Sequence, residues 1–166
     1  MADVRTIALS VNGQAVRRPV QPRQHLVDFL RDALGLKGSH LGCEHGVCGA
    51  CTVEVDGRIV RGCLTLAVQA DGRRVRTIEG VSQDGDVTDL QEAFVRRNAL
   101  QCGFCTPGMV LAAKELLETK PDATRAEVRE WMGGNYCRCT GYHAIVDAIC
   151  DTLDARAGRA AAGAVR

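Results

Sequence analysis

The chain has 166 residues, of which 46% are apolar and 25% charged, as is ordinary for a globular protein. A net charge of +1 and only 4% aromatic residues argue against a nucleic-acid-binding surface and against an anionic membrane as partner. No apolar stretch approaches the ~20 residues of a transmembrane helix. Residues 1–6 contain no apolar signal core, so we expect a cytoplasmic protein.

The first half of the sequence predicts strands around one helix. Apolar residues alternate on both sides of Asn12-Gly13, which is a tight-turn sequence typical of a β-hairpin. Apolar residues at helical spacing predict a helix over 25–34. A loop rich in glycine and cysteine follows over 42–51, and a second hairpin turns at Asp56-Gly57. A short strand over 75–78 completes this half.

In the second half of the sequence, apolar residues recur at the spacing that is typical of helices. Thr88-x-x-Gln91 and Thr124-x-x-Glu127 are capping-box patterns, and Thr106-Pro107 is typical of a hydroxyl N-cap followed by proline. Thr140-Gly141 precedes a fourth helix, expected over 142–155. We therefore predict an α+β fold with a first domain over 1–78, a linker over 79–86, a four-helix domain over 87–156 and a disordered tail over 157–166.

Cysteine is the unusual residue, because the chain has nine and eight of them fall into two groups of four. In an intracellular protein, clustered cysteines are more often metal ligands than disulfides. The first group has the spacing C-x4-C-x2-C followed by one distant cysteine, which is that of plant-type ferredoxins. Structural zinc sites usually contain two paired C-x2–4-C motifs, so zinc is the weaker alternative. The predicted ligands of this first [2Fe–2S] cluster are Cys43, Cys48, Cys51 and Cys63.

The second group consists of two cysteine pairs that each lie just before a predicted helix. A helix N-terminus carries partial positive charge and unpaired N–H groups, which suit an anionic metal centre. The spacing alone indicates a four-cysteine metal site, and the two helix starts favour a charged [2Fe–2S] cluster. The predicted ligands are Cys102, Cys105, Cys137 and Cys139.

Three segments together resemble the signature of the xanthine oxidase family of molybdenum hydroxylases. They are GCEHGVCGACTV over 42–53, QCGFCTPGM over 101–109 and GNYCRCTGY over 134–142. More closely, the chain resembles the small iron–sulfur subunit of three-subunit members such as CO dehydrogenase, quinoline and nicotine dehydrogenases and 4-hydroxybenzoyl-CoA reductase. The resemblance implies a β-grasp, plant-ferredoxin-like domain followed by an all-α, four-helix [2Fe–2S]-binding domain.

The resemblance also implies the function of an electron-transfer subunit in an oxidoreductase complex. Electrons would pass from a molybdenum–pterin dinucleotide centre on a large subunit, through the two clusters of this chain, to FAD on a medium subunit. A dimer of such heterotrimers is expected. Gln101 matches the family glutamine that hydrogen-bonds the pterin, and Cys139 matches the ligand nearest to it. The implied substrate is an N-heterocyclic or aromatic compound, with CO or an aldehyde as alternatives.

Two other classes of function remain open at this point: a free-standing two-cluster ferredoxin and a zinc-stapled interaction module. We predict no catalytic residue in this chain, because the sequence has neither a nucleotide-binding glycine motif nor a nucleophile–base arrangement outside the predicted ligands. Arg138, between two ligands, is expected to offset cluster charge or to contact the pterin or a neighbouring subunit. His40 and His45 are expected to be loop residues, and Cys150 a buried apolar thiol.

Overall fold

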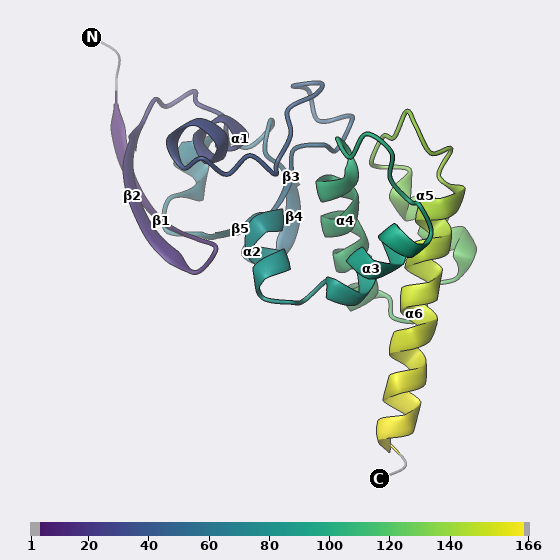
Figure 1. Ribbon diagram of the computed structural model, residues 1–166. Helices are drawn as coiled ribbons and strands as arrows, with labels where there is room; N and C mark the ends of the chain where they lie inside the picture. Colours follow the sequence, from purple (N-terminus) through teal and green to yellow (C-terminus); the bar gives the residue numbers. More distant parts are fainter. Residues whose placement is uncertain (1–3, 165–166) are drawn as a thin grey trace.

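The computed structural model describes the backbone of residues 4–164 and the side chains of residues 4–158. A β-sheet forms one side of the molecule and a group of helices the other (Figure 1). The sheet has the strand order β2-β1-β5-β3-β4, in which β1 and β5 are parallel and the other neighbours antiparallel. Its strands are β1 (Arg5–Val11), β2 (Gln14–Val20), β3 (Thr52–Val55), β4 (Arg58–Arg61) and β5 (Arg74–Arg76).

Both predicted hairpins are confirmed, and their turns explain the register of the sheet. Asn12 and Gly13 have φ values of 50° and 79°, and Asp56 and Gly57 have values of 50° and 82°. Positive φ at both central residues is the type I′ turn, whose twist matches that of the paired strands. The two turns thus set the register of the β1–β2 and β3–β4 pairs.

The helix predicted over 25–34 has a less regular geometry than expected. It consists of a short α-helix α1 (Leu26–Asp28) that continues as a π-helical segment η1 (Phe29–Ala33). The apolar spacing placed it correctly, because Leu26 and Phe29 are fully buried against the sheet. A 3-10 turn η2 (Ala67–Ala70) packs beside it. The strand predicted over 75–78 ends at Arg76, where β5 ends.

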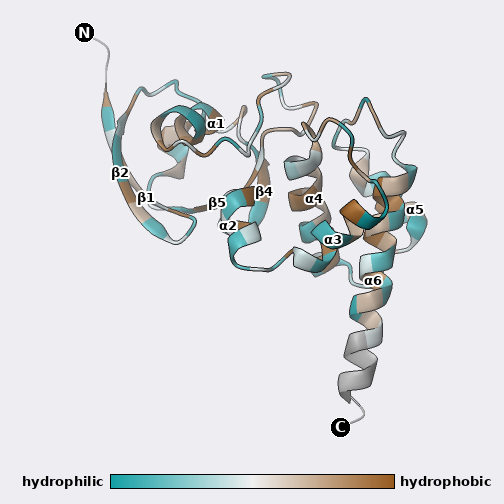
Figure 2. Ribbon diagram, viewed as in Figure 1, coloured by the Kyte–Doolittle hydropathy of each residue, from teal (hydrophilic) through white to brown (hydrophobic). Residues whose placement is uncertain are grey.

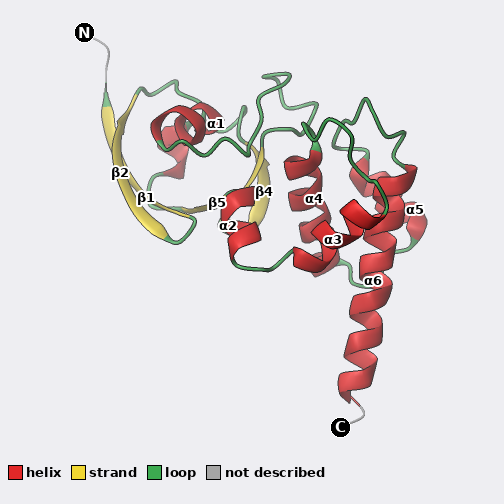
Figure 3. Ribbon diagram, viewed as in Figure 1, coloured by secondary structure: helices red, strands yellow, loops and turns green. Residues whose placement is uncertain are grey.

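Helices occupy the second half, and α3–α6 confirm the predicted four-helix domain (Figure 3). The predicted linker over 79–86 was wrong in one respect, because helix α2 fills most of it. Its Glu79 carboxylate accepts a hydrogen bond from the Gly38 N–H at 2.7 Å, which attaches α2 to the first domain. The helices are α2 (Ile78–Gln83), α3 (Thr88–Arg96), α4 (Thr106–Thr119), α5 (Arg125–Met132) and α6 (His143–Ala164).

The disordered tail predicted over 157–166 was wrong for residues 157–164, which continue α6. Alanine has the highest intrinsic helix propensity, so an alanine-rich extension of an existing helix needs no apolar periodicity to remain helical. The last two predicted tail residues, 165–166, lie outside the described residues. None of the helices within the described part of the chain is long and apolar enough to cross a membrane.

The capping predictions had mixed outcomes. The Thr124 capping box is confirmed, since the Thr124 hydroxyl accepts from the Glu127 N–H while the Glu127 carboxylate accepts from the Thr124 N–H at 2.8 Å. The box expected at Thr88 was wrong, because Gln91 donates its amide to the Ser82 hydroxyl instead, at 2.8 Å. The N-cap expected at Thr106 was also wrong, because the preceding residue occupies the N-cap position of α4.

Two hydrophobic cores meet where β3 and α4 lie against each other. The first lies between the sheet and α1, and the second is formed mainly by α3, α4, α5 and α6. Figure 2 shows hydrophobic residues on α4, in the middle of the molecule. At the junction, the buried Glu54 carboxylate of β3 lies 2.8 Å from the Lys114 ammonium of α4. The Glu115 carboxylate accepts the Ile59 N–H of the edge strand β4 at 3.0 Å.

Candidate iron–sulfur centres

The predicted ligands gather on loops at one end of the molecule, at the top in Figure 1. The loop before β3 carries three cysteines, and the turn after β4 carries the fourth of that group. The loop between α3 and α4 carries one pair of the second group, and the loop between α5 and α6 carries the other pair. Segments far apart in sequence are therefore brought together there as expected.

In the first group, backbone N–H groups point at the thiols. The Cys48 N–H lies 3.4 Å from the Cys43 sulfur, and the Cys63 N–H lies 3.4 Å from the Cys51 sulfur. Hydrogen bonds from the backbone of Cys48 and then of His45 lower the pKa of Cys43 to about 6. Burial, followed by the neighbouring Cys51 thiol, raises the pKa of Cys63 to about 11. Such N–H groups stabilise thiolate sulfur, which is the form that binds iron.

Glycines let this loop fold tightly around its cysteines. Gly46 and Gly49 have φ values of 84° and 74°, in the region that favours glycine. A Cβ added at Gly42 would lie 3.2 Å from the Cys48 sulfur, and one at Gly46 would lie 2.3 Å from the Leu64 side chain. Larger residues would push the loop away from the thiols, so the glycines preserve the space around the predicted ligands.

In the second group, the thiols lie close to one another in pairs. The Cys102 and Cys139 sulfurs lie 3.6 Å apart. Burial, and then the neighbouring Cys137 thiol, raises the pKa of Cys105 to about 12. The Thr140 hydroxyl donates to the Cys137 sulfur at 3.2 Å. Burial would raise the pKa of Cys137, but this hydrogen bond and nearby backbone N–H groups outweigh burial and lower it.

Gln101 and Cys139, the two residues predicted to face the pterin, lie next to each other on the surface. The Gln101 side-chain amide donates to the Cys139 carbonyl at 3.0 Å, although 38 residues separate them in sequence. Both side chains are exposed, as is Cys102. The exposed edge formed by these three residues can therefore contact another molecule directly.

The arrangement of the thiols suits a two-iron cluster in each group. A [2Fe–2S] cluster takes four thiolates, two on each iron. The contact between the Cys102 and Cys139 sulfurs, and the N–H and O–H groups directed at sulfurs in both groups, fit that requirement.

A contact between the two cysteine loops was not foreseen from the sequence. The His40 ring stacks on the Phe104 ring with centroids 4.7 Å apart, and the His40 Nδ1 lies 2.7 Å from the Phe104 carbonyl oxygen. His40 is a loop residue, as predicted, but the sequence does not predict its stacking on Phe104. The only indication in the sequence is that both residues lie close to predicted ligands. His40 precedes Cys43, and Phe104 lies between Cys102 and Cys105.

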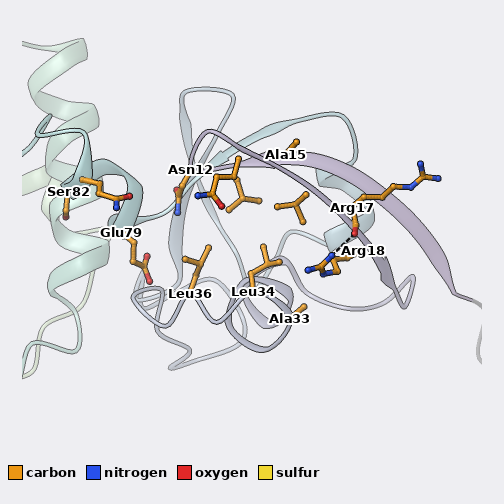
Figure 4. A pocket seen from close by; sticks show the side chains of 13 residues that line it. Asn12, Ala15, Arg17, Arg18, Ala33, Leu34, Leu36, Glu79 and Ser82 are labelled. Carbon is orange, nitrogen blue, oxygen red and sulfur yellow. Dashed lines mark hydrogen bonds between the residues drawn. The ribbon is translucent and has the colours of Figure 1, made fainter.

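A cavity of about 860 Å³ lies apart from these loops, between the β1–β2 hairpin, the end of η1 and helix α2 (Figure 4). None of the predicted ligands lines it. Among the described residues that line it, the one carboxylate is that of Glu79, which is already bonded to the Gly38 N–H and the Thr77 hydroxyl, at 2.7 and 2.6 Å. No carboxylate of the described lining residues is therefore free in this cavity.

Comparison with known proteins assigns both halves of the chain to iron–sulfur families. Residues 9–76 match the family of 2Fe-2S iron-sulfur cluster binding domains, and residues 77–150 match the [2Fe-2S] binding domain family. The small subunit of nicotine 6-hydroxylase from Paenarthrobacter nicotinovorans is 55% identical over 87% of this chain and 87% of its own length. This chain belongs to the iron–sulfur small subunits of the xanthine oxidase family. It is therefore an electron-transfer subunit of an oxidoreductase, and the zinc-stapled alternative is not retained.

Further relatives include separate small subunits and one much longer polypeptide. Caffeine dehydrogenase subunit gamma from Pseudomonas sp. is 51% identical over 86% of this chain and 87% of its own length. The crystal structure of quinoline 2-oxidoreductase from Pseudomonas putida 86 matches with a TM-score of 0.87 and 51% identity, over 94% of this chain and 96% of that chain. Aldehyde oxidoreductase from Desulfovibrio gigas matches over 93% of this chain but only 17% of its own, with a TM-score of 0.85 and 44% identity. The same fold therefore also occurs as part of a much longer polypeptide.

Proposed function

We propose that this small subunit relays electrons from a molybdenum–pterin dinucleotide centre on a large partner subunit to FAD on a medium partner subunit. When bound, each [2Fe–2S] cluster supplies a one-electron redox centre. Cys43, Cys48, Cys51 and Cys63 hold one cluster, and the second group of four cysteines holds the other. The names of the relatives refer to nicotine, caffeine and quinoline, which are N-heterocyclic compounds. We therefore propose an N-heterocyclic substrate, selected by the large subunit.

The observation that carries this proposal is the direct contact between the two ligand loops. The Tyr136 N–H donates to the Cys48 carbonyl at 2.8 Å, so a residue next to one proposed ligand bonds to a proposed ligand of the other group. The buried Asn135 side chain donates to the Gly49 carbonyl at 3.2 Å in the same place. Electron transfer weakens steeply with distance, and loops in direct contact keep the two centres close.

The difference in exposure between the two groups supports a direction for the relay. Cys51 and Cys63 are buried in the first domain, whereas Cys102 and Cys139 are exposed beside Gln101. We propose that this exposed edge receives the pterin of the large subunit, with the Gln101 amide as a hydrogen-bond donor. Electrons then enter at the second group and leave through the first.

Quantitative EPR of the dithionite-reduced native complex, integrated against a spin standard, tests this function. We expect two distinct signals, each close to one spin per small subunit, and molybdenum and flavin in the same complex. A single signal, or a complex without molybdenum, would overturn the proposal. A stable native monomer that reduced an external acceptor would instead establish the free-standing ferredoxin.

Cys105→Ser tests the path through the second group, with Cys150→Ser as the matched control. Cys105 is a proposed ligand and Cys150, on α6, is not. We expect Cys105→Ser to abolish one EPR signal and the reduction of flavin by substrate, while Cys150→Ser retains both. Flavin that is still reduced at the normal rate in Cys105→Ser would show that electrons take another path.

We further propose that the complex is cytoplasmic, because cysteines that serve as metal ligands rather than disulfides are typical of reducing compartments. The proposed assembly is a dimer of heterotrimers. Light scattering on the purified complex gives its mass and distinguishes this assembly from a single heterotrimer.

A further inference from the structure

Arg61, on strand β4, joins the segments that carry both groups of cysteines. Its guanidinium donates to the Thr52 hydroxyl, to the Gly134 carbonyl at 2.6 Å and to the Asn135 side-chain oxygen at 3.2 Å. The first contact lies within the sheet, and the other two reach the loop between α5 and α6. A single side chain thus spans from the first domain to the second.

Each residue that Arg61 contacts lies close to a proposed ligand. Thr52 follows Cys51 directly, and Asn135 lies two residues before Cys137. Arg61 itself lies two residues before Cys63. The position of the guanidinium is therefore coupled, through very short stretches of backbone, to ligands on both sides.

Asn135 extends this contact to the first cysteine loop. It is only 1% exposed, its Oδ1 accepts from Arg61, and its Nδ2 donates to the Gly49 carbonyl at 3.2 Å. A Cβ added at Gly49 would lie 2.6 Å from the Asn135 side chain, so the two loops are already in close contact. A planar guanidinium with donors in a rigid fork can satisfy three acceptors in one geometry, which an ammonium group on a flexible stem cannot reproduce.

We propose that Arg61 is a positioning residue that sets the separation and relative orientation of the two cysteine loops, and thereby the coupling between the two redox centres. This inference rests on the proposed function, because it takes the eight cysteines as the cluster ligands. Arg61 touches no substrate and acts only through the backbone and side chains that it holds.

The test compares Arg61→Gln and Arg61→Lys with Arg58→Gln in the purified native complex. Arg58 lies on the same strand, but its side chain is 85% exposed and pairs with Glu115 at 3.6 Å, away from the cysteine loops. The readouts are the magnetic interaction between the two reduced clusters by low-temperature EPR and the midpoint potential of each cluster. A residue that only stabilised the fold would lower the unfolding temperature and leave the magnetic interaction of the folded complex unchanged.

We expect Arg61→Gln to weaken the magnetic interaction at least twofold, and Arg61→Lys to weaken it while the retained charge leaves the midpoint potentials near those of the unmodified complex. Arg58→Gln is expected to change neither. An unchanged interaction in Arg61→Gln would overturn the proposal. If the original complex itself lacked two cluster signals, the proposed function would fail instead, so the two failures are distinguishable.

A second variant covers the case in which Arg61→Gln does not accumulate as a folded complex. Asn135→Ala keeps the arginine charge and removes only the amide that connects the guanidinium to Gly49. A weakened magnetic interaction in this variant supports the same proposal, and an interaction of unchanged strength overturns it.

Discussion

Cys150 is the ninth cysteine and the one that neither proposed cluster uses. Predicted to be a buried apolar thiol, it is only half-buried, and packs against the second core from α6. Burial raises the pKa of this thiol, and Asp154 and Asp147 raise it further, while Arg125 acts in the opposite direction. The thiol therefore stays protonated to higher pH in the folded protein than in the unfolded chain.

The raised pKa of Cys150 predicts that the free energy of unfolding depends on pH. The stability that a raised pKa contributes is fully present below the pKa of the thiol in the unfolded chain, about 8.5 for cysteine. This stability is lost as the pH rises through the pKa of the thiol in the folded protein. Above about pH 8.5 we expect the unmodified protein to lose stability relative to Cys150→Ala and Cys150→Ser, neither of which ionises. Thermal unfolding of the three proteins from pH 7 to 10 measures this. A difference that stays constant across that range would contradict the assignment.

At the scale of elements, strand β3 and helix α4 set the relation between the two halves. Each begins at a proposed ligand, since Cys51 precedes β3 and Cys105 is the N-cap residue of α4. Farther along, the two elements are joined by the Glu54–Lys114 ion pair, in which both side chains are about 5% exposed. Burial would lower the pKa of Lys114, but hydrogen bonds to Glu118 and Glu54 outweigh burial and raise it.

Removing one partner of this pair is expected to be costly. Within the described part of the chain, Lys114→Met would leave the buried Glu54 carboxylate paired with Arg76 alone, at 3.6 Å. Breaking a buried ion pair costs about 3–5 kcal/mol, and we expect the lower end because Arg76 remains. Denaturant unfolding measures the loss. Glu118→Gln is the control, because that carboxylate is 51% exposed and its removal is expected to change stability by at most about 1 kcal/mol. Equal stabilities for the two variants would show that the Glu54–Lys114 contact contributes little.

At the scale of the whole molecule, the two halves approach so closely that only glycine fits between them. A Cβ added at Gly108, in the first turn of α4, would lie 2.3 Å from the Gly49 carbonyl oxygen. This neighbour is backbone and cannot rotate away, so a side chain at Gly108 must separate α4 from the first cysteine loop.

Gly108→Ala is therefore expected to destabilise the protein by about 1–3 kcal/mol, the usual cost of overpacking. Because the two loops would move apart, the magnetic interaction between the two reduced clusters should weaken as well. Gly158→Ala on α6 is the matched control, since its added Cβ would meet nothing within 4 Å. Replacing glycine by alanine in an open helical position typically stabilises by about 0.4–1 kcal/mol. If both variants gained stability, the close contact at Gly108 would not exist in solution.

The sequence by itself determined the fold class, the eight proposed ligands and the family. Cysteine spacing is local, and it is specific because three thiolates from one loop reach one cluster only at certain intervals. The two hairpins were also predictable, because Asn12-Gly13 and Asp56-Gly57 favour positive φ without help from the rest of the chain. Local chemistry was sufficient for each of these.

Only the tertiary structure decided how the two halves join. The sequence placed Glu54 and Arg61 on strands and His40 in a loop, but their partners Lys114, Asn135 and Phe104 are 60 to 74 residues away. Such contacts depend on how two domains pack, which no local pattern encodes. The same reason applies to residues 79–86, because α2 is attached to the first domain through the hydrogen bond between Gly38 and Glu79.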